Sequence, residues 1–149
     1  MFKGNFPYTI DPKGRMSVPT RFRGLMPDQG DGRQLVITLG ITGQCLWAYP
    51  QEEWKEIENQ ITQTKSSLQK DAFVRNFIGN AHECTIDKMG RVLIPLVLRE
   101  KAFLKKQVVI VGALGKFEIW DKDVFKDLEE SEDSFTQAQE FYESEEIRV

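Results

Sequence analysis

Two short segments combine an acidic and a basic residue at the same spacing, and they are the strongest candidates for chemistry in the sequence. Asp11 stands four positions before Arg15. Asp87 stands at the same distance before Arg91. Arginine offers a planar fork of hydrogen-bond donors that suits the edge of a guanine base or a phosphate group. The aspartate either accepts a hydrogen bond from the arginine and fixes its direction, or it binds backbone amides of a turn. Each pair is therefore a nucleic-acid contact or a staple that holds a β-turn together.

Further basic residues lie close to both pairs in the sequence. Clustered cations of this kind can follow a phosphate backbone, whose contacts dominate the affinity of proteins for nucleic acids. Met89 takes in the second segment the place that Lys13 has in the first, so we expect the first segment to bind more strongly. The predicted DNA-binding residues are Asp11, Lys13, Arg15, Arg21 and Arg23 around the first pair, and Asp87, Lys88 and Arg91 around the second.

Catalytic alternatives have little support in the sequence. His82 is the only histidine, which leaves no histidine pair and no histidine-rich metal site. It stands two positions before Cys84, and on a strand that spacing puts both side chains on one face, as in a nucleophile and its base. A free cysteine is more simply a core residue. With no glycine-rich phosphate loop and no zinc-binding spacing, we expect no enzyme activity, metal, cofactor or small-molecule ligand.

The charge of the chain is unevenly distributed. With 20 basic and 23 acidic residues, the formal net charge of −3 argues at first against a nucleic-acid partner. Residues 121–149 hold eleven acidic and three basic residues, a net of −8, whereas residues 1–120 hold seventeen basic and twelve acidic ones, a net of +5. A basic body with an acidic end is associated with nucleic-acid binding. The alternative is an acidic helix that is merely solvated.

Composition and cysteine usage indicate an ordinary cytoplasmic chain. The 149 residues, of which 40% are hydrophobic, are typical of a soluble globular protein. No apolar run has the length of a membrane span, and the first residues lack the apolar stretch of a signal peptide. Cys45 and Cys84 lie far apart and lack the spacing of a metal site. We therefore expect both to be reduced and not joined in a disulfide. We therefore expect no membrane association.

The two acidic–basic segments belong to a longer internal repeat. Residues 9–19 (TIDPKGRMSVP) align with residues 85–95 (TIDKMGRVLIP), with Thr, Ile, Asp, Gly, Arg and Pro in register. Arg23 and Arg99 extend the match. An apolar hairpin pattern and then a charged, helical stretch follow each copy. The chain therefore consists of two copies of one supersecondary unit, with a longer insert after the first copy.

Each copy predicts the same order of elements. A short strand leads to a tight turn, where Gly14 or Gly90 can take the positive φ that the turn needs. A second strand and a helix follow, with a proline at the first helical position. The second strands are expected at residues 16–18 and 92–94, the helices at 20–26 and 96–104, a loop at 28–32, and hairpin turns at 40–43 and 112–115.

The insert is predicted to be helical. Pro50 favours a helix start, and Gly79 suits a C-terminal cap. Apolar residues at helical spacing form two stripes, which we interpret as core or subunit contacts. The stripes comprise Trp54, Ile57 and Ile61, and Ala72, Phe73 and Phe77. Trp47 and Trp120, at matching positions of the repeat, are most simply core residues.

Neither unit is large enough to fold alone. At roughly 70 residues with four short strands, a unit buries too little apolar surface. We therefore expect the two halves to interleave into one pseudo-symmetric body that is mainly β with peripheral helices (α+β). The expected divisions are 1–50 for the first repeat, 51–80 for the helical insert, 81–125 for the second repeat and 126–149 for an acidic helical tail.

Taken together, these motifs closely resemble the MraZ family over residues 1 to about 125. The resemblance rests on Phe2-x-Gly4, DPKGRMSVPTRFR at 11–23, LWAYP at 46–50, Glu53-Trp54, residues 83–99 and VGALGKFEIWD at 111–121. It implies two AbrB-like (SpoVT-AbrB) halves that form one double-split β-barrel, assembled into a ring-shaped homo-oligomer. The family's Asp-x-x-x-Arg motif is its DNA-contacting element, and here it falls on Asp11 with Arg15 and on Asp87 with Arg91.

The resemblance also implies a function. Members of this family are bacterial transcriptional regulators that bind short direct repeats at the promoter of the division and cell-wall gene cluster and usually repress it. Arg15 is then expected to read bases, Lys13, Arg21 and Arg23 to contact phosphates, and Asp11 to orient Arg15, in a cytoplasmic, nucleoid-associated protein. One alternative is a partner-binding protein, like antitoxins of the same fold, whose acidic tail binds a basic protein. A thiol enzyme or hydrolase at His82 and Cys84 is the other.

Overall fold

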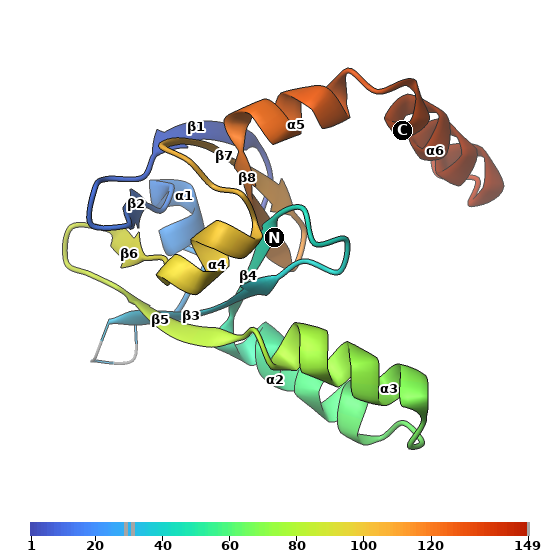
Figure 1. Ribbon diagram of the computed structural model, residues 1–149, viewed down its shortest axis with the longest axis horizontal. Coiled ribbons are helices and arrows are strands. Elements are labelled where there is room, and N and C mark those ends of the chain that lie inside the picture. Colours follow the sequence, from blue (N-terminus) through green and yellow to red (C-terminus); the bar gives the residue numbers. More distant parts are fainter. Residues whose placement is uncertain (29, 31, 149) are drawn as a thin grey trace.

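A computed structural model describes residues 1–28, 30 and 32–148, and it shows strands as the main component with helices at the periphery (Figure 1). The first unit contains β1 (Asn5–Thr9), β2 (Arg15–Ser17), α1 (Thr20–Arg23), β3 (Arg33–Leu39), β4 (Leu46–Pro50) and α2 (Gln51–Thr62). The second repeats that order in β5 (His82–Ile86), β6 (Arg91–Leu93), α4 (Leu96–Lys101), β7 (Gln107–Ala113), β8 (Lys116–Asp121) and α5 (Lys122–Glu129). Between the units lie α3 (Leu68–Phe73) and η1 (Val74–Ile78), and α6 (Glu132–Ser144) follows α5. The expected mainly-β fold class is confirmed.

Strand pairing interleaves the two units, as their small size predicted. The six-stranded antiparallel sheet has the order β1-β7-β8-β4-β3-β5. The first strand of each unit pairs with the third strand of the other: β1 with β7, and β5 with β3. If each strand is replaced by its counterpart in the other unit, the same strand order is obtained, now read from the opposite edge of the sheet. The molecule is therefore built around a pseudo-twofold axis, and its sheet is open, with β1 and β5 at the two ends.

The second strands of the two units form a separate antiparallel ribbon, β2–β6. In its register Arg15 lies opposite Leu93, Met16 opposite Val92, and Ser17 opposite Arg91. Met16 and Val92 point inward and are buried, so the other four side chains share the outward face. The ribbon thus presents both arginines of the repeat on one side of the molecule.

A single main core lies beneath the ribbon. Phe22 of α1 is fully buried, and its ring packs against Phe2, Phe6 and Phe117 at centroid distances of 4.9, 5.4 and 5.2 Å. Leu98 of α4 is buried in the same cluster. Deleting an aromatic side chain from such a site costs about 3–5 kcal/mol. The helices that follow the ribbon therefore anchor it to the sheet.

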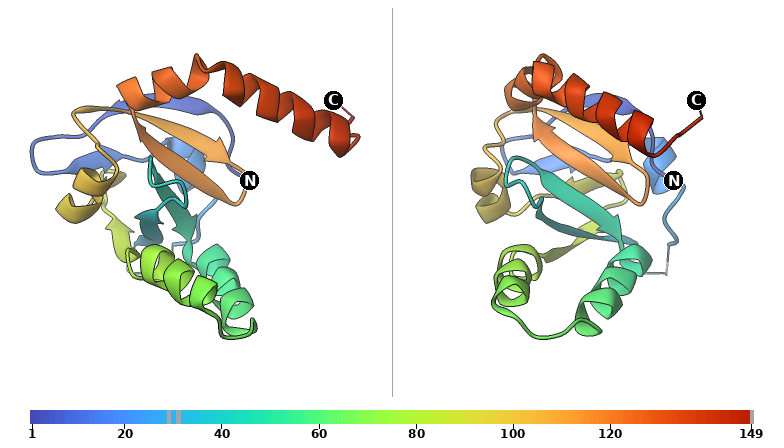
Figure 2. Two further views of the ribbon diagram at one scale, coloured as in Figure 1. Left: turned by 45° about the vertical axis from the view of Figure 1, so that its right-hand side comes forward. Right: turned by 90° about the vertical axis from the view of Figure 1, so that its right-hand side faces the viewer.

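The helical insert packs on the other side of the sheet (Figure 2). Trp54 of α2 and Phe77 of η1 are 7% and 4% exposed, and they contact Tyr49 of β4 in a second cluster. Four of the six stripe residues are thus core contacts within the chain, namely Trp54, Ile57, Phe73 and Phe77. Trp120 is buried as expected, and Trp47 is partly buried against this second cluster.

Several local predictions differ from the structure by a residue or more. The strands of the ribbon begin one residue earlier than expected, and α1 and α4 are shorter than the helices predicted there. Pro19, Pro50 and Pro95 occupy the N-cap, one position before the first helical residue. β7 continues through Gly112, so the second hairpin is tighter than predicted. Gln29 and Asp31 of the expected 28–32 loop lie outside the described residues.

Gly79 follows η1, but it does not adopt the left-handed conformation of a typical C-terminal cap. Its φ is −64°. A Cβ atom at this position would clash with the carbonyl oxygen of Arg75. Lack of space, and not backbone freedom, therefore explains glycine here.

The acidic C-terminal segment begins at a buried residue, Asp121, which precedes α5. Asp121, only 2% exposed, caps α5 by accepting hydrogen bonds from the backbone N–H groups of Asp123 and Val124. Beyond α5 the chain turns, and α6 projects away from the sheet (Figures 1 and 2). All of α6 except Ser134 is exposed. In the part of the chain that the structure describes, no helix has both the length and the apolar character that crossing a membrane requires.

Candidate nucleic-acid interface

Each Asp-x-x-x-Arg segment forms a tight turn in which the aspartate makes both kinds of contact considered for it. In the first turn, Asp11 Oδ1 accepts hydrogen bonds from the backbone N–H groups of Lys13 and Arg15, both at 2.9 Å. Its Oδ2 accepts from Arg15 Nε at 2.7 Å. The aspartate therefore staples the turn with one oxygen and orients the arginine with the other.

The second turn repeats this geometry. Asp87 Oδ1 accepts from the backbone N–H groups of Met89 and Arg91 at 2.9 Å, and Oδ2 accepts from Arg91 Nε at 3.2 Å. The backbone hydrogen bond from Arg91 is the largest cause that lowers the pKa of Asp87, and that from Arg15 has the same effect on the pKa of Asp11. Both carboxylates are thus held in the charged form that orients the arginine.

The bond to aspartate leaves the outer end of each arginine available. Only Nε of Arg15 is engaged by Asp11, and the side chain is 33% exposed. Among the described residues neither Nη1 nor Nη2 of Arg15 has a hydrogen-bond partner, and the same holds for Arg91. Each turn therefore presents a directed pair of donors toward solvent, the form of donor that reads O6 and N7 of guanine.

A second arginine lies against each turn, and it comes from the other unit. Gly14 has a φ of +89°, and a Cβ atom there would lie 2.7 Å from Nη2 of Arg99. Gly90 has a φ of +78°, and its Cβ would lie 2.5 Å from Nη1 of Arg23. Glycine is thus required at both positions by backbone conformation and by the guanidinium group above it.

The exchanged arginines are tied to the backbone of their own units. Arg23 Nε donates to the carbonyl oxygen of Val18 at 3.2 Å, and Arg99 Nε donates to that of Ile94 at 3.0 Å. The two units are joined at the same places, because Val18 N donates to Gly90 O and Ile94 N donates to Gly14 O, both at 2.9 Å. Because of these bonds between the units, Arg99 lies at the first turn and Arg23 at the second.

The predicted site residues are therefore regrouped in space. Asp11, Lys13 and Arg15 lie together at the first turn as expected, and Asp87, Lys88 and Arg91 at the second. Arg23, which the sequence places near Arg15, lies against the second turn instead, and Arg21 is exposed on the same short helix. Each turn thus takes a cation from the other unit, and the stronger binding expected of the first segment stays a prediction.

Sequence reasoning left Arg99 out of the candidate site, although the repeat contained the signal. Arg99 occupies the position of Arg23 in the second copy. In the structure it lines a surface groove beside Asp11, together with Lys105 and Lys106. The equivalent groove at the second turn contains Arg23, Asp87 and Lys88. Each groove therefore places cations beside an Asp-x-x-x-Arg turn.

The thiol considered as an alternative site is buried, which disfavours its reactive form. Cys84 is 7% exposed, and burial raises the pKa of its thiol to about 11. His82 Nδ1 is hydrogen-bonded to Asn80 O at 2.9 Å. Since the thiolate is the nucleophilic form, a raised pKa disfavours this role. No group of three metal-ligating side chains occurs in the described part of the chain.

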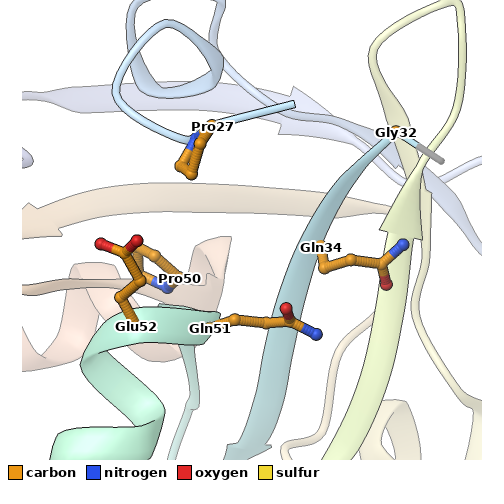
Figure 3. A pocket seen from close by; sticks show the side chains of 6 residues that line it. All are labelled: Pro27, Gly32, Gln34, Pro50, Gln51 and Glu52. Atoms are coloured by element: carbon orange, nitrogen blue, oxygen red, sulfur yellow. The ribbon is translucent and has the colours of Figure 1, made fainter. Parts of the chain in front are cut away.

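A small pocket lies between the start of α2 and β3, and its described lining residues do not form a catalytic site (Figure 3). Two prolines and two glutamines contribute to its wall, and among the described lining residues Glu52 is the only ionisable one. Those residues include no nucleophile and no cation for a charged ligand. The lining residues are Pro27, Gly32, Gln34, Pro50, Gln51 and Glu52.

Comparison with known proteins matches this architecture to one family. The family model described as "MraZ protein, putative antitoxin-like" matches the chain twice, at residues 1–76 and 77–142. The protein named transcriptional regulator MraZ from Pelotomaculum thermopropionicum is 46% identical over 83% of this chain and 81% of its own length. Its namesakes from Shewanella denitrificans and Desulforamulus reducens are 38% and 44% identical, over 94% and 83% of this chain and 92% and 83% of their own lengths. With two family matches that together span nearly the whole chain, the protein belongs to the MraZ family.

Proposed function

We propose that this chain is a sequence-specific double-stranded-DNA-binding transcriptional regulator. The observation that carries the proposal is the outward face of β2–β6, where Arg15 and Arg91 are each held through Nε by an aspartate while Nη1 and Nη2 point to solvent. The printed names of the relatives, all transcriptional regulators, support the same function.

The ribbon has the right form for the major groove of DNA. That groove admits a two-stranded β-ribbon, and a bidentate arginine–guanine contact is the commonest specific contact in it. Arg15 and Arg91 read guanine edges, and the aspartates keep their guanidinium groups from swinging away. The surrounding cations bind phosphates and set the position of the ribbon on the duplex. These phosphate contacts are Lys13, Arg21, Arg23 and Lys88.

Assembly into an oligomer compensates for the modest DNA affinity of a single chain. One chain offers few cations, so its affinity falls steeply as salt rises. In a ring-shaped homo-oligomer several identical faces engage successive short direct repeats, and each contact raises the effective concentration of the next. Occupation of the promoter of its own division and cell-wall gene cluster then represses transcription in the cytoplasm, in association with the nucleoid, and no cofactor is needed.

Replacing Arg15 with alanine tests the proposal. A bidentate contact to guanine is worth about 1–3 kcal/mol, so each site should lose affinity by roughly 5-fold to 150-fold. Gel-shift titration against the chain's own upstream DNA, repeated over a salt series, measures this. Lys55→Ala removes an exposed cation from α2 and should bind like the wild type. Light scattering at micromolar concentration should give the same oligomer for all three proteins.

Two results would overturn the proposal. Unchanged DNA retention by Arg15→Ala would show that Arg15 does not contact DNA. A strictly monomeric wild type would show that the chain does not form a ring.

A second candidate function has one observation in its favour. On α6, Phe135 and Phe141 are 72% and 59% exposed among acidic residues. An acidic helix with uncovered aromatic side chains suits a basic protein partner, in an antitoxin-like role. Capture of such a partner, lost when residues 131–149 are removed while DNA binding persists, would favour this function.

A further inference from the structure

We infer that the two ends of the β2–β6 ribbon read different bases, because Leu93 lies beside Arg15 and contacts the methyl group of a thymine next to the guanine that Arg15 reads. The inference rests on the proposed DNA-binding function and names the sequence that one half of the site selects. At the other end, Ser17 lies beside Arg91 and selects no methyl group.

The register of the ribbon places these residues as direct neighbours. Arg15 lies opposite Leu93, and Ser17 lies opposite Arg91. The flanking bonds from Ile94 N to Gly14 O and from Val18 N to Gly90 O make both pairs non-hydrogen-bonded positions. Side chains approach most closely at such positions, with Cβ atoms about 4.5–5.5 Å apart. Each arginine thus has one fixed companion on the outward face.

Leu93 is not needed by the core. Its neighbour Val92 is 1% exposed and points inward, whereas Leu93 is 57% exposed. The aliphatic side chain stands among cations of the candidate interface, and Ser17 holds the same place in the first unit. An exposed leucine directly opposite Arg15 is available to contact an apolar group on whatever Arg15 binds.

Thymine supplies such a feature at a suitable distance. Its C5-methyl group is the one apolar marker in the major groove, and apolar side chains contact it there. Neighbouring bases on a strand are about 3.4 Å apart, about 1–2 Å less than the Cβ separation of two opposed side chains on the ribbon. When Arg15 binds O6 and N7 of guanine, Leu93 therefore lies over the adjoining base. A serine at the equivalent place accepts or donates to several bases and so discriminates weakly.

This difference gives the bound chain a direction. The backbone of the ribbon is pseudo-symmetric, and with identical side chains it would bind DNA equally well in two opposite orientations. At the centre of the face this symmetry is broken, because one unit has Leu93 where the other has Ser17. A further difference at its rim is Met89, 72% exposed, against Lys13. Copies of the chain are then oriented alike, which successive direct repeats require.

Removing single methyl groups from DNA tests the inference. The probe is the duplex that the wild-type full-length chain selects from a randomised pool, with each thymine replaced in turn by deoxyuridine. At one thymine beside an essential guanine, the substitution should weaken binding about fourfold, the effect of one buried methyl group. Leu93→Ser should bind the thymine duplex as weakly as the wild type binds the deoxyuridine duplex and should not respond to the exchange. Ser17→Leu, its matched counterpart, should gain a response to thymine at the other half-site.

The outcomes separate the inference from the proposed function. If the pool yields no preferred duplex, the proposed function fails. If Arg15→Ala loses binding but no deoxyuridine substitution weakens the wild type, the DNA-binding function stands and the thymine contact is wrong. If Leu93→Ser changes the oligomer in light scattering, Leu93 is a subunit contact and the inference is overturned.

Discussion

The two oxygens of Asp11 have separable roles, and this separation can be used experimentally. One oxygen holds the turn amides and the other holds Arg15 Nε at 2.7 Å. Asparagine keeps one carbonyl oxygen for the amides, but its NH₂ group faces the arginine as a second donor. The fold and the direction of the arginine therefore depend on different atoms of the same side chain.

We predict that Asp11→Asn leaves the turn intact and weakens specific DNA binding by releasing Arg15. Thermal unfolding followed by circular dichroism should be nearly unchanged, while gel-shift affinity for the selected duplex should fall several-fold. Asp87→Asn is the matched variant at the second turn. Wild-type affinity in Asp11→Asn would show that the ion pair has no orienting role.

The pH dependence of this pair follows from the lowered pKa of Asp11. Because the folded-state pKa lies below the ordinary 3.8, the carboxylate is charged throughout the neutral range. Its stabilising contribution is present above the unfolded-state value and is lost only as pH falls through the folded pKa. DNA binding measured between pH 6 and 8 should therefore show no effect of this carboxylate titrating.

At the scale of elements, strand β5 and the segment before β4 keep the two thiols out of water. Burial raises the pKa of Cys84 to about 11 and that of Cys45 to about 12. We predict that neither reacts with Ellman's reagent at pH 8 in the folded chain, whereas both react in urea. The unfolded thiols lose protons at lower pH than the folded ones, so stability should fall as pH rises above about 9. Rapid labelling of the native protein would restore Cys84 as a candidate nucleophile.

The repeat in the sequence predicted most of the elements but not which unit each one contacts. Strands, glycine turns and short helices follow from local patterns of apolar residues, glycine and proline, and these agree with the structure to within a few residues. Interleaving followed from the small size of each unit. The position of Arg23 did not, because it depends on the cross-bond between Val18 and Gly90, which lie 72 positions apart. Sequence proximity to Arg15 was therefore a poor guide to the composition of the site.

The helix stripes of the insert show the same limit. Their spacing indicated burial, but it did not distinguish a core within the chain from a contact between subunits. Trp54 and Phe77 are covered by the chain's own sheet. Burial of Trp54 and Phe77 is therefore explained without a subunit contact, whereas the aromatic side chains of α6 stay uncovered within the chain.

Over the whole molecule, the acidic end of the chain consists of an anchored part and a projecting part. Asp121 is buried and accepts a hydrogen bond from the backbone N–H of Lys105 as well as capping α5. Removal of everything from residue 121 would therefore damage the body itself. A truncation after Glu130 removes only α6 and the residues that follow it.

We predict that this truncation raises non-specific DNA affinity. Residues 131–149 hold six acidic residues against one basic, so the formal net charge changes from −3 to +2. Less repulsion of phosphates should strengthen binding to unrelated DNA, most clearly at low salt. Gel shifts with the selected duplex and with scrambled DNA measure both affinities, and an unchanged thermal midpoint is the control. Unaltered binding to scrambled DNA would show that the tail does not screen the basic face.

The exchange of strands between units also constrains how the chain comes to be folded during its synthesis. β1 ends at Thr9, whereas its partner β7 is not complete until residue 113 has been added. Until then the apolar residues of the first unit have no sheet to cover them, and β3 lacks its neighbour β5 as well. Pairings this distant in the sequence form slowly and leave strand edges exposed meanwhile. The growing chain therefore keeps unpaired strand edges until β7 has been made, and we expect the first unit expressed alone to aggregate.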